Sequence, residues 1–183
     1  MATVAIIYHS GYGHTARVAD HVRLGVLRVE GVTAVLMSAE QPDWSALDAA
    51  DAIILGAPTY MGSVSAAFKT FMDQTSRQWL NQAWKDKLAA GFTNSGGLSG
   101  DKLSVLFQLQ IFAAQHGMLW VPLPLMPTGT GPDDINRMGS HLGLMTQSDN
   151  APAELTPPAG DIRTAELFGA HVAERALRWS STA

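Results

Sequence analysis

The 183-residue sequence predicts an α/β fold in which helices cover both faces of a parallel sheet. Short continuous apolar runs, rich in β-branched residues, indicate strands that are buried on both sides. Longer segments with an apolar residue at every third or fourth position lie between these runs and indicate crossover helices. Because the two kinds of segment alternate along the chain, one doubly wound domain explains the pattern.

The expected strands span residues 4–8, 32–37, 52–56, 88–93 and 118–121, and the expected helices about 15–28, 66–78, 103–116 and 163–179. In the first helix, Val18, Val22 and Val26 form one apolar stripe, as a helix packed on a sheet requires. The fifth strand ends at Pro122 and Pro124, because proline has no N–H to donate to a sheet. We expect all of these elements to form a single domain, 1–183.

Residues 125–161 interrupt this alternation. The stretch contains scattered glycines and five prolines, Pro127, Pro132, Pro152, Pro157 and Pro158. Proline and glycine at this density indicate a long loop-rich insertion rather than a second domain. A functional loop and a merely solvated one are both compatible with this composition.

The composition excludes several classes of function. The chain has no cysteine, which excludes disulfides, thiolate nucleophiles and cysteine-ligated metals. Its net charge of −4, without a basic run, argues against a nucleic-acid partner, and its six histidines lack metal-ligand spacing, so we expect no metal. No apolar run reaches the roughly 18 residues of a membrane span, and the N-terminus carries no export pattern, so we expect a cytoplasmic protein without membrane insertion.

The loop between the first strand and the first helix has the features of a phosphate-binding loop. It reads Ser10, Gly11, Tyr12, Gly13, His14, Thr15. Backbone N–H groups at a helix start, together with the helix dipole, favour an anion there. Two hydroxyl groups but no lysine or arginine lie in the loop, unlike the P-loop of ATPases. We therefore expect a nucleotide-like cofactor and no ATP hydrolysis.

Two other interpretations of this loop stay open. The segment can be an ordinary strand-to-helix turn in which Thr15 is the N-cap. Residues 11–16 also fit the dinucleotide fingerprint G-x-G-x-x-A, with Glu40 as an acceptor for a ribose hydroxyl. Hydroxyl groups at both ends of the loop suit a terminal phosphate monoester better than a pyrophosphate.

Two further loops follow strands of the predicted sheet and are expected at the same edge, because ligands of open parallel sheets bind at the carboxyl ends of strands. The first loop offers a stiff turn, amides, an aromatic face and a polarizable sulfur to a planar ring, from Pro58, Thr59, Tyr60 and Met61. The second offers glycines that let backbone approach a flat ligand, within Asn94, Ser95, Gly96, Gly97, Leu98 and Ser99. Each loop alone would pass as an ordinary surface loop.

Four segments in combination resemble one family. They are S-G-Y-G-H at 10–14, G-A-P-T-Y-M-G at 56–62, F-K-T-F-M-D-Q-T at 68–75 followed by Trp79, and H-G-M-L-W-V-P at 116–122. Together they resemble the flavodoxin-like NAD(P)H:quinone oxidoreductases of the WrbA type, over most of the chain. The resemblance implies a five-stranded sheet of order 2-1-3-4-5 and one bound FMN per subunit.

The resemblance also implies roles for the residues of these loops. The FMN phosphate would bind to the first loop, and the isoalloxazine ring would lie against the second and third loops. His116 would lie near the flavin from a neighbouring wall and act in catalysis, while Tyr12 and Trp79 would bind the substrate. A hydrogen-bonded histidine before a glycine turn and a core tryptophan at a helix end are the structural alternatives.

The implied reaction is hydride transfer from NADH or NADPH through FMN to a quinone or similar acceptor, in a two-electron ping-pong sequence. The alternatives are an NAD(P)H:FMN reductase that supplies reduced flavin to a partner oxygenase, and a one-electron flavodoxin-type carrier. The family also points to a homodimer or homotetramer, and the apolar stretch 123–145 is the expected contributor to a shared site.

The sequence departs from the family pattern in three places. Tyr60 stands where the family usually has arginine, and the segment 38–51 is much shorter than the family's insertion. Residues 138–143 match its glycine-rich segment only loosely. These departures affect nicotinamide recognition, subunit association and quinone specificity, respectively.

Overall fold

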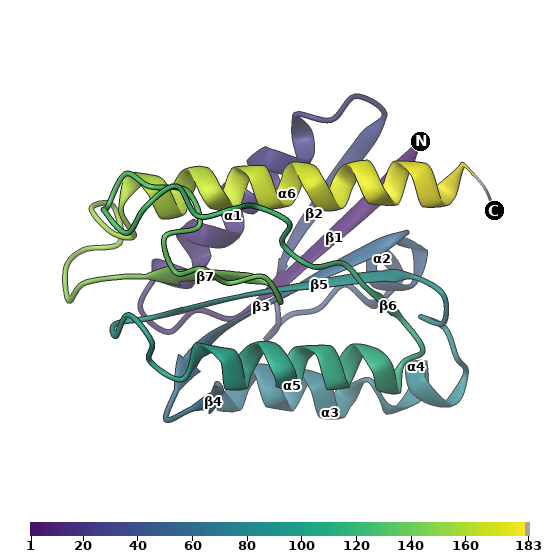
Figure 1. Cartoon of the computed structure of the whole chain (residues 1–183). Coiled ribbons are helices and arrows are strands. Elements are labelled where there is room, and N and C mark those ends of the chain that lie inside the picture. Colours follow the sequence, from purple (N-terminus) through teal and green to yellow (C-terminus); the bar gives the residue numbers. More distant parts are fainter. Residues whose placement is uncertain (182–183) are drawn as a thin grey trace.

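The computed structural model describes residues 1–181 and confirms the predicted arrangement of a parallel sheet between two layers of helices (Figure 1). The main sheet has the order β2-β1-β3-β5-β6, and every neighbouring pair along it is parallel. Its strands are β1 (Ala2–Tyr8), β2 (Val32–Ser38), β3 (Ala52–Tyr60), β5 (Leu88–Ser95) and β6 (Leu119–Trp120). In terms of the five expected strands, this order is the predicted 2-1-3-4-5.

The helices cover both faces of the sheet. On one face lie α1 (His14–Leu27) and α6 (Ala159–Ser180), and on the other lie α3 (Ala66–Gln74) and α5 (Lys102–Gln115) (Figure 1). Two shorter helices, α2 (Trp44–Ala49) and α4 (Ser76–Leu80), complete the set. The predicted valine stripe of α1 packs against α6 in one core, and Phe68, Phe71 and Leu109 fill the other.

The two helices α1 and α6 pack in direct backbone contact. A Cβ placed on Gly169 of α6 would overlap the carbonyl oxygen of Val22, and one placed on Gly25 of α1 would overlap the carbonyl oxygen of Glu166. Glycine is required at both positions because any side chain would force the helices apart. The start of α1 is thereby fixed relative to the C-terminal helix.

The structure differs from the sequence-based expectation mainly around the insertion. The strand β7 (Leu144–Gln147) lies inside it and pairs in parallel with residues 92–95 of β5, while β6 pairs only with residues 88 and 89. The fifth strand is therefore split into two short pieces. Strands β3 and β5 also continue two to four residues beyond their predicted ends, and the predicted helix 66–78 is divided at Thr75. A two-residue strand, β4 (Ser63–Val64), turns back against β3.

The stretch 123–145 supplies the core as well as the surface. Leu123 and Leu144 are completely buried, whereas Met126 is exposed. Within residues 1–181, no helix is long and apolar enough to cross a membrane, and no cluster of three or more potential metal-ligating side chains occurs.

Candidate functional site

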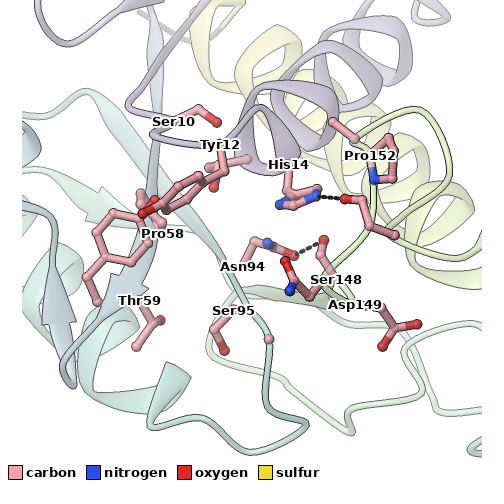
Figure 2. Close-up of a pocket in the computed structure, with 16 residues that line it drawn as sticks. Ser10, Tyr12, His14, Pro58, Thr59, Asn94, Ser95, Ser148, Asp149 and Pro152 are labelled. Carbon is pink, nitrogen blue, oxygen red and sulfur yellow. Dashed lines mark hydrogen bonds between the residues drawn. The ribbon is translucent and has the colours of Figure 1, made fainter.

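A pocket of about 460 Å³ lies at the carboxyl ends of β1, β3 and β5, where the three predicted loops meet (Figure 2). The loops contribute Ser10, Tyr12, His14, Thr15, Pro58, Thr59, Tyr60, Asn94, Ser95 and Gly96. The segment 148–153, from the insertion, forms the remaining wall. The pocket has the size and the carboxyl-end position that ligand sites of open parallel sheets have.

The N-terminus of α1 opens into this pocket without a cap. Its N-cap, Gly13, has φ 88° and therefore a left-handed conformation, and no side chain caps the helix. Ser10 Oγ accepts a hydrogen bond from the N–H of Gly13 at 3.1 Å, and the buried Thr15 lines the pocket. The first turn contains no acidic residue. Uncapped helix amides and two hydroxyl groups fit a phosphate.

The wall 148–153 is held over this end of the pocket by α1. The side chain of His14 bonds through Nε2 to the carbonyl oxygen of Ala151 at 2.8 Å (Figure 2), and Arg17 donates to the carbonyl oxygen of Ala153 at 2.6 Å. His14 was expected to bind phosphate, but its ring is engaged with this backbone instead. Proline-rich composition was the only sequence signal for the segment, and it carries no information about which loop the segment faces.

Asn94 occupies the middle of the pocket wall and has a fixed orientation. It is 5% exposed, and its Oδ1 accepts hydrogen bonds from Thr146 Oγ1 at 2.8 Å and Ser148 Oγ at 3.0 Å. Since both hydroxyl donors hold the oxygen, the Nδ2 group is the part of the amide left to donate to a ligand. The strand β7, which carries Thr146, was not predicted, although it orients a predicted residue.

Two tyrosines form the aromatic side of the pocket. The rings of Tyr12 and Tyr60 meet edge to face, with centroids 6.1 Å apart, and Tyr12 is 79% exposed. Burial, and next the neighbouring Tyr12, raise the pKa of Tyr60, so its hydroxyl stays protonated near neutral pH. A flat ring system can stack or lie edge-on against this pair.

A buried lysine stabilises the third loop from behind. Lys102 is fully buried, and its Nζ donates to the carbonyl oxygens of Gly97 and Leu98, the latter at 3.1 Å. Burial lowers its pKa to about 8, against the opposing influence of Asp161. The ion pair of Asp161 with Arg137, at 2.7 Å, is also buried. These contacts fix the backbone from which Asn94 and its neighbours reach the pocket.

The structure does not bring every expected residue into this pocket. Met61 is fully exposed, and Leu98 and Ser99 line a neighbouring groove beside Phe107. The glycines Gly11, Gly13 and Gly97 shape the loops but are not among the lining residues.

His116 and Trp79 lie elsewhere in the chain. His116 is the C-cap of α5, a helix of 14 residues and so about 21 Å long, whose first turn is the end near the pocket. Its ring packs on Trp84 with centroids 4.6 Å apart, and Nε2 bonds Thr75 Oγ1 at 2.9 Å. Burial lowers its pKa to about 4, so it is neutral. Trp79, half exposed, lies in a shallow groove beside it. Within one chain, neither residue contacts the pocket.

The pocket fits the FMN that the sequence resemblance implies. The uncapped helix amides, Ser10 and Thr15 suit its phosphate, and the tyrosine pair with Asn94 suits a planar ring that carries hydrogen-bonding edges. Phosphate and ring sites lie at opposite ends of one continuous pocket, as the shape of a flavin mononucleotide requires.

Comparisons with known proteins agree with this geometry. The family described as NADPH-dependent FMN reductase matches residues 41–131. Flavodoxin FldP of Pseudomonas aeruginosa (strain UCBPP-PA14) is 41% identical over 182 residues, which cover 94% of this chain and 96% of that protein. An NAD(P)H dehydrogenase (quinone) of Syntrophobacter fumaroxidans is 32% identical, with 96% and 97% covered.

Solved structures confirm the flavodoxin-like fold. The crystal structure of a flavodoxin, WrbA-like protein from Agrobacterium tumefaciens superimposes with a TM-score of 0.77 and 42% identity, covering 97% of this chain and 99% of that one. An archaeal flavodoxin superimposes with a TM-score of 0.68 at 17% identity and is similar in fold alone.

Proposed function

Because the chain belongs to the WrbA-type family of flavodoxin-like NAD(P)H:quinone oxidoreductases, we propose that it binds FMN in the pocket described above and reduces a quinone or similar small acceptor with NADH or NADPH. The observation that carries the proposal is the uncapped start of α1, which opens into the same pocket as the tyrosine pair. When bound, FMN supplies the chemistry of accepting a hydride and passing two electrons on.

The chain's own residues bind and orient the reactants. Backbone amides at 13–15 and the hydroxyl groups of Ser10 and Thr15 hold the phosphate, without a fixed cation. The Asn94 amide donates to the edge of the ring, and its orientation is set by Thr146 and Ser148. The exposed ring of Tyr12 lies at the pocket mouth, where a nicotinamide or quinone ring would stack.

A second copy of the chain is expected to complete the site. Tyr12 is largely exposed, so the mouth of the pocket is open to water that hydride transfer must avoid. Helix α5, beside the pocket loops, exposes an apolar stripe of Leu103, Phe107 and Ile111, which suits a subunit contact. In such an assembly a partner's Trp79 region could supply the missing wall.

The flavodoxin name of a relative at 41% identity favours a second candidate, a one-electron carrier. Reductive titration of the purified protein, followed by visible absorption, separates the two. An oxidoreductase of the proposed kind passes directly from oxidised to two-electron-reduced flavin and oxidises NADH or NADPH when a quinone is added. A stable semiquinone without nicotinamide oxidation would assign the carrier role.

The third candidate, an FMN reductase that releases its product, is favoured by the description of the matching family. Gel filtration of the FMN-loaded protein tests it, since a quinone reductase with resident FMN elutes with its flavin. Loss of the flavin on the column, with NAD(P)H-dependent reduction of added FMN, would instead support the reductase. A protein that binds no flavin would overturn all three candidates.

A further inference from the structure

A second groove, of about 500 Å³, lies at the end of the sheet opposite the FMN pocket. It is formed by the last turns of α6 and by the segment that follows β6 (Figure 1). Leu88, which lines it, is the first residue of β5, whereas Asn94 and Ser95 near the end of β5 line the FMN pocket. The two sites are therefore about 20 Å apart along the strand, and the second one does not rest on the proposed function.

The groove is lined mainly by apolar surface. Two indole rings, Trp120 and Trp179, lie in it, with Val121, Pro122 and Pro124. Both indole N–H groups are already used, because Trp120 donates to the carbonyl oxygen of Leu142 at 2.7 Å and Trp179 to that of Asp86 at 2.9 Å. The rings are thus fixed in place and contribute apolar faces rather than donors.

The charged side chains of the groove are all basic. Its described lining includes Arg175, Arg178 and His171, and neither aspartate nor glutamate, although the whole chain has a net charge of −4. Burial, then Arg175, lower the pKa of His171, so the imidazole is neutral and the two guanidinium groups supply the positive charge. A cationic end beside an apolar floor is the complement of an amphipathic anion.

Arg175 is the strongest anion-binding group in the groove. Its Nε is buried and has no hydrogen-bond acceptor within residues 1–181. An adjacent, half-exposed carboxylate, Glu174, contacts its Nη2 at 3.2 Å, which is a weak surface pair. The side chain is 36% exposed, so its outer nitrogens can still receive a ligand. A partly desolvated guanidinium gains most from a carboxylate, which it binds through two parallel hydrogen bonds.

We propose that this groove is a binding site for a small aromatic carboxylate, whose ring lies against Trp120 and Trp179 and whose carboxylate pairs with Arg175. The aromatic part accounts for the apolar floor, and the acid group accounts for the buried Nε of Arg175 that lacks an acceptor. Such a ligand would bind the protein independently of the flavin, at the other end of the sheet.

The test uses 2-naphthoate as the probe and protein kept in excess FMN, so that the first pocket is filled. Binding is followed by the indole N–H signals of Trp120 and Trp179 in ¹⁵N-labelled protein. We expect both signals to shift with saturation, and 2-naphthamide, which has the same ring without the charge, to bind at least about tenfold more weakly. Equal binding of the amide would overturn the proposal, and this comparison needs no variant.

Two variants test the role of the guanidinium. Arg175→Gln should weaken 2-naphthoate by about tenfold or more, and Arg175→Lys should fall between it and the parent, because lysine keeps the charge but loses the planar fork. Arg23→Gln, which removes a charge from the surface pair with Asp20, is the matched control and should leave the affinity unchanged. Unaltered binding in both Arg175 variants, or shifts confined to residues around Tyr12, would assign the ligand to another site.

Discussion

Replacing Lys102 with methionine removes a charge that lies in the interior directly behind the third pocket loop. The side chain is fully buried, and burial lowers its pKa from the ordinary 10.5 to about 8. The folded state therefore holds the proton less tightly than the unfolded chain does. It follows that the charged lysine destabilises the fold below about pH 8, and that this penalty decreases as the pH rises from about 8 to about 10.5.

The size of the effect follows from the two pKa values. One pKa unit corresponds to about 1.4 kcal/mol, so the parent should gain about 2 kcal/mol relative to Lys102→Met between about pH 7 and about pH 9.5. Other groups that titrate in this range are present in both proteins and cancel in the difference. Only the change of this difference with pH is predicted, because methionine also leaves the carbonyl oxygens of Gly97 and Leu98 without their donor.

Urea unfolding followed by circular dichroism, at both pH values, measures the difference. Lys69→Met is the control, because Lys69 is exposed and pairs with Asp73 on the surface of α3, so its removal changes the net charge by the same amount. A parent-minus-Lys102→Met difference that stays constant with pH would refute the reasoning. The carbonyl oxygens and Asp161 would then compensate the buried charge as well as water does.

Three further predictions concern the pocket and the core. Thr15→Ala should weaken FMN binding by about 1–2 kcal/mol, because a charge-assisted hydrogen bond is lost. Gly13→Val should weaken it more, since the residue has φ 88° and a Cβ there would lie 3.1 Å from the Cβ of Ala153. Trp84→Ala should cost about 3–5 kcal/mol of stability, because the ring is fully buried, whereas Trp79→Ala, at a half-exposed site, should cost far less.

Flavin fluorescence titration measures the first two effects, and thermal unfolding of the apoprotein measures the third. Thr70→Ala, on the exposed side of α3, is a control for the loss of a threonine hydroxyl. FMN affinity near that of the parent in Gly13→Val would remove the first loop as the phosphate site. Similar losses of stability in the two tryptophan variants would show that the shallow groove at Trp79 is closed in solution.

The sequence predicted those parts of the site that follow directly from strand ends. The three loops could be located because a parallel sheet places the carboxyl ends of its strands at one edge, and because glycine and hydroxyl residues there suit a phosphate or a flat ligand. Pro58, Thr59 and Asn94 lie in the pocket as expected, although β3 and β5 extend through them. The local pattern gives the position of such residues but not the end of the hydrogen-bonded ladder.

The remaining parts depend on contacts between distant segments. The wall 148–153 reaches the pocket through His14 and Arg17, some 136 residues away, and no periodicity records that pairing. Strand β7 was missed because, at only four residues long and with Leu144 and Thr146 buried, it resembles any irregular stretch. His116 was placed near the flavin by family resemblance, whereas its own chain buries it at the far end of α5.

The close contact of α1 with α6 makes the width of the phosphate site a property of residues that never touch a ligand. Gly25 and Gly169 set the distance between the two helix axes, and α1 in turn carries both the amides of the phosphate site and the side chains that hold the wall 148–153. A single methyl group at Gly169 would push α1 and its loop outward by the thickness of that group. Differences in flavin affinity between variants of this fold should therefore arise at the helix crossing as readily as in the pocket itself.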